Sequence, residues 1–237
     1  MQVKTKAIVL SALKFNEKSL IVKCFTLSDG LKSYFVPNAF SSKKDKQKIA
    51  YFQPLTLLEI EATHKNKGTL EYFKDLKIAN PYYTINTNIY KSTIVLFVSE
   101  IMSNCIQEEE KNEGMFSFFE TALLWLDHQK EFSNFHLMFL LEITKFMGFY
   151  PDTIDIDYGY FDLSEGIFIP MQGVNCLTAH ETALFKKLIA LKFNSDQKLF
   201  SGVERQLLLK IILSFYKSHL DGFRHPKSLD VLKEVFA

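Results

Sequence analysis

A cluster of lysines carries the clearest chemistry in this sequence. Lys43, Lys44, Lys46 and Lys48 fall within six positions of a Ser/Lys-rich stretch that interrupts an otherwise apolar segment. Lysine side chains bind phosphate, and aromatic rings beside them stack on bases, which is how sequence-tolerant nucleic-acid sites are built. The stretch therefore predicts a nucleic-acid-binding loop, and the competing interpretation is a solvated loop with no ligand.

Other basic and aromatic residues extend this pattern. Three predicted neighbouring strands carry further lysines that are expected to continue the positive charge onto a barrel face: Lys4, Lys6, Lys14, Lys23 and Lys32. Five aromatic residues near the loop are stacking platforms or core residues: Tyr34, Phe35, Phe40, Tyr51 and Phe52. Of these we select Tyr34, Phe40 and Tyr51 for base stacking.

Catalytic patterns are weak. No two of the six histidines have the i, i+4 spacing of a zinc-binding helix, and neither a phosphate-binding Gly-x-x-x-x-Gly-Lys nor a Gly-x-Ser-x-Gly motif occurs. Four aspartates, Asp152, Asp155, Asp157 and Asp162, could hold a divalent ion but lack the full calcium-loop pattern. We predict no catalytic residue, metal or cofactor, and a metal-dependent hydrolase is the weakest of three alternatives.

The charge is distributed unevenly along the chain. Residues 1–80 contain 14 Lys and 7 acidic residues, whereas residues 81–170 contain 4 Lys and 14 acidic residues. The last 67 residues are basic again, so that the net charge of the whole chain is only +1. A basic segment followed by an acidic one predicts two domains, the first of which binds a polyanion.

The first domain, residues 1–80, has the period-two pattern of strands. Five strands are expected at residues 4–14, 19–26, 31–37, 55–63 and 68–79, joined by polar turns and one long connection after the third. This arrangement predicts a small Greek-key barrel of the OB type, and a five-stranded sandwich or SH3-like barrel would give the same pattern.

The second domain, residues 81–237, begins at Pro81, where the periodicity changes to that of helices. Helices are expected near residues 88–107, 115–129, 135–147, 179–191, 203–219 and from 228 onward. A β-hairpin is expected within residues 152–175, because two short apolar runs flank Ser164-Glu165-Gly166. The expected fold class is therefore α+β, with an OB-type barrel followed by a mostly helical domain.

The lack of a targeting signal and the spacing of the cysteines predict a cytoplasmic protein. The sequence has neither a secretory signal nor an apolar run of the roughly 20 residues that a membrane span needs. Its three cysteines are widely spaced, which fits neither a disulfide framework nor a paired zinc clamp.

Several ordered fragments resemble the RecO family, the bacterial recombination mediators of DNA repair. The resemblance covers nearly the whole chain and is carried by residues 5–10, 17–22, 25–26, 30–31, 53–56, 76–77 and 227–232, with Gly148 and Pro151. It implies an OB fold, a helical C-terminal domain, no enzymatic turnover, and binding to single- and double-stranded DNA.

The resemblance also implies partners. RecO proteins anneal complementary strands coated with single-strand binding protein, whose acidic C-terminal tail they recognise, and with RecR they help to load RecA. By this resemblance we expect the protein to be cytoplasmic and associated with the nucleoid. Lys186, Arg205 and Lys210 are candidates for binding the tail. The alternative is an adaptor whose barrel binds RNA or an acidic protein.

The sequence departs from many of these relatives in one place. They have a four-cysteine zinc module after the Gly…Pro turn, whereas this chain has residues 155–160 in place of the first pair and only Cys176 nearby. Four-coordinate structural zinc cannot be built from one cysteine. The hairpin is expected to hold through apolar contacts of Tyr160, Phe161, Ile167 and Phe168.

The loop lysines provide a first test. We expect Lys43→Glu combined with Lys44→Glu to abolish annealing of complementary oligonucleotides, because two phosphate-binding charges become repulsive. Circular dichroism should show an unchanged fold. Normal annealing by this folded double variant would remove the loop from the DNA site.

Overall fold

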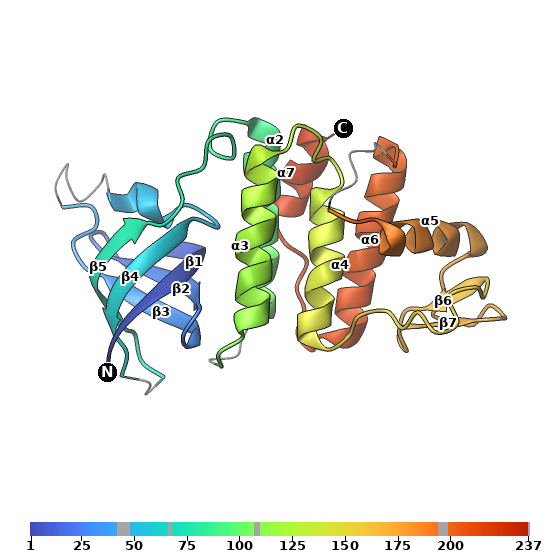
Figure 1. Cartoon of the computed structure of the whole chain (residues 1–237), viewed down its shortest axis with the longest axis horizontal. Coiled ribbons are helices and arrows are strands. Elements are labelled where there is room, and N and C mark those ends of the chain that lie inside the picture. The colour runs from blue at the N-terminus through green and yellow to red at the C-terminus, as the bar shows by residue number, and fades with distance from the viewer. Residues whose placement is uncertain (42–47, 66–67, 107–109, 194–198, 237) are drawn as a thin grey trace. The chain divides into compact units, whose positions relative to one another are not determined.

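The structure is a computed structural model that describes residues 1–41, 48–65, 68–106, 110–193 and 199–236. The chain divides into two compact units, residues 1–128 and 129–237. Among the described residues, the first unit contains a five-stranded sheet, one short 3-10 helix and two α-helices, and the second contains four α-helices and a small hairpin (Figure 1). The expected α+β class is confirmed, while the domain boundary expected at residue 80 stays a prediction.

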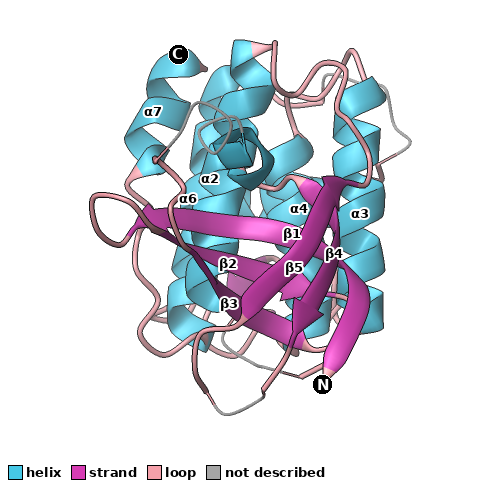
Figure 2. Ribbon diagram, turned by 90° about the vertical axis from the view of Figure 1, so that its left-hand side faces the viewer, coloured by secondary structure: helices cyan, strands magenta, loops and turns pink. Residues whose placement is uncertain are grey.

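Five antiparallel strands form the sheet of the first unit (Figure 2). They are β1 (Gln2–Lys14), β2 (Leu20–Thr26), β3 (Gly30–Val36), β4 (Leu57–Thr63) and β5 (Tyr72–Ile78), in the order β3-β2-β1-β4-β5. A parallel bridge between Tyr34 and Glu71 joins the two outer strands, where Phe35 N donates to Glu71 O at 2.8 Å and Glu71 N to Ser33 O at 2.8 Å. The sheet is therefore closed into a barrel, as the OB prediction requires.

The barrel interior is filled by the alternate, inward-facing residues of each strand. Tyr34 is fully buried and stacks on Phe73 with ring centroids 4.1 Å apart. Its hydroxyl lies 2.7 Å from Nε2 of the buried His64, whose Nδ1 lies 3.0 Å from the Asp29 carboxylate. This chain of polar contacts ties β3, the end of β4 and the turn between β2 and β3 together.

Two helices, α2 (Ile89–Cys105) and α3 (Glu113–His128), stand against one side of the barrel (Figure 1). The Ser99 hydroxyl of α2 donates to Leu10 O at 2.5 Å, and the ring of Phe25 lies 5.9 Å from the rings of both Phe116 and Phe119 in α3. These apolar contacts explain why β2 is buried on both faces around Phe25.

Asp127, in the last turn of α3, fixes the segment that leads into α2. Its carboxylate accepts hydrogen bonds from the backbone N–H groups of Tyr83, Thr84 and Ile85 at 2.8, 2.8 and 2.9 Å. Burial opposes ionisation of this carboxyl, but the three N–H donors outweigh it and hold its pKa below the ordinary value. Lys91 Nζ donates to Asp127 O at 2.9 Å and completes the junction.

The second unit consists of α4 (Phe135–Met147), α5 (Ala179–Ala190), α6 (Gly202–His219) and α7 (Ser228–Val235), with the hairpin of β6 (Tyr160–Asp162) and β7 (Ile167–Ile169). Thr178 and Glu181 form the expected capping box at the start of α5, and Gly148 ends α4 with φ 82°. A second capping box, Ser201 with Glu204, begins α6 and was not recognised in the sequence.

An aromatic cluster holds the hairpin to the helices. Phe161 is fully buried, with its ring centroid 4.9 Å from Phe168, 4.9 Å from Phe185 of α5 and 5.7 Å from Phe215 of α6. Ile167, expected to join this core, faces solvent with 38% of its surface exposed. The carboxylate of Asp162 accepts from Ser164 N at 2.8 Å and thereby shapes the turn.

Within the described residues, no three His, Cys, Asp or Glu side chains are grouped in a way that could hold a metal ion. The four aspartates of the hairpin region do not form such a group. No helix in the same part of the chain is long and apolar enough to cross a membrane.

The aromatic cluster predicts a large effect of Phe161→Ala. Removing a fully buried ring should lower the free energy of unfolding by about 3–5 kcal/mol, since transfer and cavity costs add. Urea denaturation followed by circular dichroism measures this.

Ile154→Ala is the matched control, because Ile154 is 86% exposed and its truncation should change stability by less than about 0.5 kcal/mol. Equal stability of the two variants would mean that the cluster does not hold the hairpin.

A buried histidine gives the second unit a pH dependence. His136 of α4 is 4% exposed and its ring lies 6.0 Å from Phe236. Burial, helped by the positive charge of Arg205, lowers the pKa of His136 to about 3. The unfolded chain therefore binds a proton below pH 6.5 that the folded chain does not bind.

We expect His136 to lower the free energy of unfolding by about 1.4 kcal/mol per pH unit as pH falls from 6.5 toward 3. Between pH 6.5 and 5, where carboxylates titrate little, the loss should reach about 2 kcal/mol. Denaturant unfolding of wild type and His136→Gln across this window tests the expectation. Parallel pH profiles of the two proteins would show that His136 does not titrate as described.

Candidate nucleic-acid interface

The outer face of β1, β4 and β5 carries lysines that are compensated by acidic residues. Lys4 Nζ lies 2.5 Å from Glu61, Lys6 Nζ lies 2.6 Å from Glu120 of α3, and Lys77 pairs with Glu59 at 2.8 Å. Hydrogen bonds from these lysines hold the pKa values of Glu59 and Glu61 below the ordinary range. A phosphate on this face would have to displace a carboxylate.

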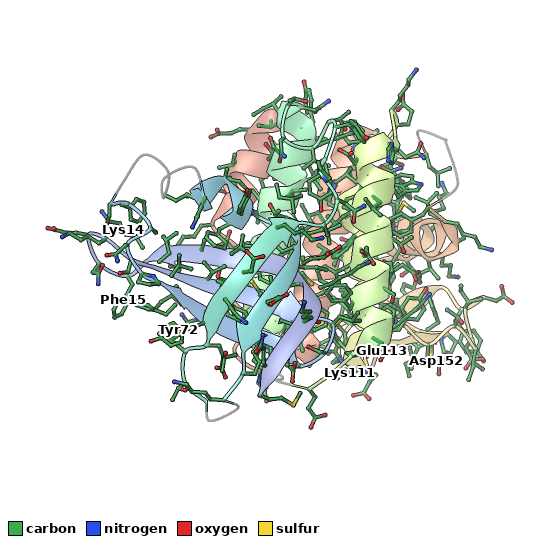
Figure 3. The ribbon with its side chains drawn as sticks, turned by 60° about the vertical axis from the view of Figure 1, so that its left-hand side comes forward. Lys14, Phe15, Tyr72, Lys111, Glu113 and Asp152 are labelled. Carbon is green, nitrogen blue, oxygen red and sulfur yellow. The ribbon has the colours of Figure 1, made fainter. Side chains whose placement is uncertain are left out.

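A pocket of about 590 Å³ lies on the same face, and its lining includes Lys111 and Glu113. Figure 3 shows these two residues at the start of α3. Four lysines and four acidic residues line the pocket: Lys4, Lys6, Lys77, Lys111, Glu59, Glu61, Asp75 and Glu113. The balance of charge makes the pocket a poor site for a polyanion.

Two of the predicted DNA-binding lysines are buried or partly buried. Lys32 is only 5% exposed, and Lys23 Nζ donates to the backbone oxygen of Ser103 in α2. Burial lowers the pKa of Lys23. The structure does not bring Lys4, Lys6, Lys14, Lys23 and Lys32 together on one exposed face.

The long connection after β3 is described only in part. Lys43, Lys44 and Lys46 lie outside the described residues, whereas Lys48 is exposed next to the short helix η1 (Ile49–Phe52). Phe40 and Tyr51 are partly buried against the barrel core, and Phe52 is buried in it. Tyr34 has no exposed surface, so its ring cannot stack on a base in this structure.

The exposed aromatic surface lies elsewhere on the barrel. Register pairs Leu13 with Ile21 and Ile21 with Phe35, so these residues share the outer face of β1, β2 and β3. The ring of Phe35 lies 6.1 Å from Phe15, in the turn after β1, and 6.0 Å from Tyr72 of β5. We call Leu13, Phe15, Ile21, Phe35 and Tyr72 the outer row.

The outer row is open to solvent. Leu13 is 66% exposed, Phe15 60% and Tyr72 46%. Figure 3 shows Phe15 and Tyr72 along the outer edge of the barrel, with Lys14 beside Phe15. Exposed apolar side chains that gather in one patch mark a binding surface.

Three lysines lie near this row: one contacts a ring of the row, and two are neighbours of Phe15 in the chain. Lys65 Nζ lies 5.5 Å from the centre of the Tyr72 ring, Lys14 Nζ lies 5.5 Å from the centre of the Phe40 ring, and Lys18 is exposed in the turn that contains Phe15. The backbone N–H of Lys65 is held by the buried Glu71 carboxylate at 2.8 and 2.9 Å. Strands 2 and 3 of an OB barrel, with its first and last hairpin loops, are where oligonucleotides bind.

Sequence reasoning missed Phe15, Lys18, Lys65 and Tyr72 as site residues. The sequence did contain one indication for Phe15. It lies in a polar turn, two residues after Leu13, so the alternation of the preceding strand places both side chains on the same face. An aromatic residue in such a position has no core to enter.

The three cations proposed for tail binding lie at separate places in the second unit. Lys186 Nζ donates to Tyr158 O at 2.7 Å beside the hairpin, and Lys210 is exposed on α6. Arg205 donates to Phe200 O at 2.6 Å and lines a small cavity with Leu209, Leu232 and Phe236. Of these three residues, Arg205 alone lines this cavity, and Lys233 lines it too.

Comparisons with known proteins agree with this architecture. The family model described as "Recombination protein O N terminal" matches residues 1–82, and that described as "Recombination protein O C terminal" matches residues 86–229. The chain is 65% identical to "DNA repair protein RecO" of Flavobacterium johnsoniae and 63% identical to that of Flavobacterium psychrophilum, over all of each chain. Identity to the protein of the same name from Christiangramia forsetii is 40%, again over all of both chains.

The resemblance read from the sequence is thereby confirmed, and the matches extend through both units. The chain belongs to the RecO family of DNA repair proteins.

Proposed function

We propose that this protein is a non-enzymatic mediator of recombinational DNA repair that binds single- and double-stranded DNA and anneals complementary strands. The observation that carries the proposal is the outer row with its lysines, placed on the oligonucleotide-binding side of an OB barrel. The names of the relatives support a role in DNA repair.

Phosphate contacts come first from lysines that are exposed near the outer row. Lys14, Lys18, Lys48 and Lys65 have this position, and the loop residues Lys43, Lys44 and Lys46 remain part of the proposal from the sequence. Such contacts are independent of base sequence, as annealing of any complementary pair requires.

The remaining lysines contribute differently. Lys4 and Lys6 are in surface ion pairs, which are worth about 0–1 kcal/mol each and so can exchange a carboxylate for a phosphate. Lys23 and Lys32 add to the positive potential of the barrel rather than contacting DNA directly.

The helical unit supplies protein contacts in this proposal. An acidic C-terminal tail of single-strand binding protein would place a carboxylate near Arg205 and Lys233, which both line this small cavity. Lys186 and Lys210 lie outside that cavity and would contact other parts of such a partner. With RecR, the protein would then help RecA onto coated strands in the cytoplasm, close to the nucleoid.

Annealing of labelled complementary oligonucleotides, with and without single-strand binding protein and across a salt series, tests the function. We expect acceleration that survives the protein coat and weakens with salt. If about five phosphates are neutralised, the affinity for a single strand should fall with a log–log slope of about −3.5.

Lys14→Glu with Lys65→Glu should slow annealing strongly, while the matched control Lys217→Glu, an exposed residue of α6, should not. Absence of DNA binding at low salt by the wild type would reject the function and leave the adaptor alternative.

A further inference from the structure

We propose that Phe15, Phe35 and Tyr72 form a subsite for unpaired nucleobases, which makes the barrel select single strands over duplex DNA. This inference rests on the proposed DNA-binding function and assigns its ligand chemistry. It replaces Tyr34, Phe40 and Tyr51 as stacking residues, since the first is enclosed in the core and the others pack against it.

Two of the three rings are exposed and the third, Phe35, is half-buried beside them, whereas other aromatic side chains of the barrel are enclosed in its core. Phe25, Tyr34 and Phe52 are buried, whereas Phe15 is 60% and Tyr72 46% exposed. Leaving large rings in water costs free energy that core packing would recover, so their clustering indicates a ligand with flat apolar faces. Nucleobases have such faces, and the surrounding lysines match the phosphates that accompany them.

The spacing of the rings favours unstacked bases. Phe35 lies 6.1 Å from Phe15 and 6.0 Å from Tyr72, measured between ring centroids. Bases in a stacked strand follow one another at about 3.4 Å. Neighbouring bases can therefore meet neighbouring rings only if they have separated from one another, which a flexible single strand allows and a duplex does not.

The scaffold holds two of the three rings, Phe35 and Tyr72, in place before any ligand arrives. Phe35 N donates to Glu71 O at 2.8 Å, so the bonds that close the barrel also set Phe35 beside Tyr72. The Glu71 carboxylate holds the backbone of Lys65, whose ammonium lies over the Tyr72 ring. A site arranged in advance loses less entropy on binding.

The same subsite also bears on release of the annealed duplex. Once two complementary strands pair, their bases face each other inside the duplex and no longer reach the rings. Only phosphate contacts remain, and the product has lost the base contacts that held each substrate strand.

The test compares two single strands of equal length, oligo-dT and the same backbone with abasic sites in place of every base. Both carry the same phosphates, so any difference in affinity reports contacts to bases. We expect the wild-type full chain to bind oligo-dT at least about fivefold more tightly, because one stacked base contributes a factor of about 5 to 140.

Phe15→Ala combined with Tyr72→Ala should bind the two strands equally and keep the wild-type salt slope and duplex affinity. Both side chains are largely in solvent, so the variant should fold. The matched control is Tyr83→Ala, which removes an aromatic ring that is 78% exposed in the segment before α2 and should leave the preference for oligo-dT intact.

The outcomes are distinct. Equal binding of both strands by the wild type would overturn the subsite and leave DNA binding standing, whereas no binding of either strand would reject the proposed function itself. A double variant that loses affinity for both strands together, with a shallower salt slope, would show that the rings position lysines rather than bases, and would also overturn the subsite.

Discussion

The closure of the barrel between β3 and β5 is the constraint on which the N-terminal unit depends. Two backbone hydrogen bonds join the strands at Tyr34 and Glu71 and remove two open sheet edges that would otherwise pair with other chains. The buried contacts from Tyr34 through His64 to Asp29 reinforce the closure with side chains. Phe35 directly follows Tyr34, and Tyr72 directly follows Glu71, so the closure also sets the geometry of the exposed rings.

The strands, the helices and their order could be predicted from the sequence. Buried residues recur every second residue in a strand and about every 3.6 residues in a helix. The alternation around Val22, Cys24 and Tyr34 reflects an inward face, and the capping box of Thr178 and Glu181 has a local signature. Lysine partners could not be predicted in this way. Lys4 meets Glu61 because β1 and β4 pair in one particular register across a long separation in sequence, and no local pattern specifies that register.

The aromatic residues also show which features local patterns can predict. Alternation along β3 turns Tyr34 inward and Phe35 outward, and this alternation can be read from the sequence. Phe40 and Tyr51 lie in the long connection, where no period operates, and their packing against the core depends on the path of the chain. The positive charge of the first 80 residues therefore indicated a polyanion ligand but not its place, since carboxylates on β4 and α3 neutralise the lysines of one face.

A protein that anneals DNA must bind single strands quickly and must also release the duplex product. The barrel can do both only if charge and base stacking have separate roles. Phosphate contacts alone would hold duplex product at least as well as substrate, because a duplex carries the higher charge density. Stacking alone would bind strands slowly, since it lacks the long-range attraction that steers encounter. An exposed row of rings bordered by lysines combines electrostatic capture with contacts that pairing removes. Phe35 and Tyr72 belong to strands of the closed barrel, so their base contacts are fixed in space. The lysines have long, flexible side chains, so the phosphate contacts can exchange as the strands move.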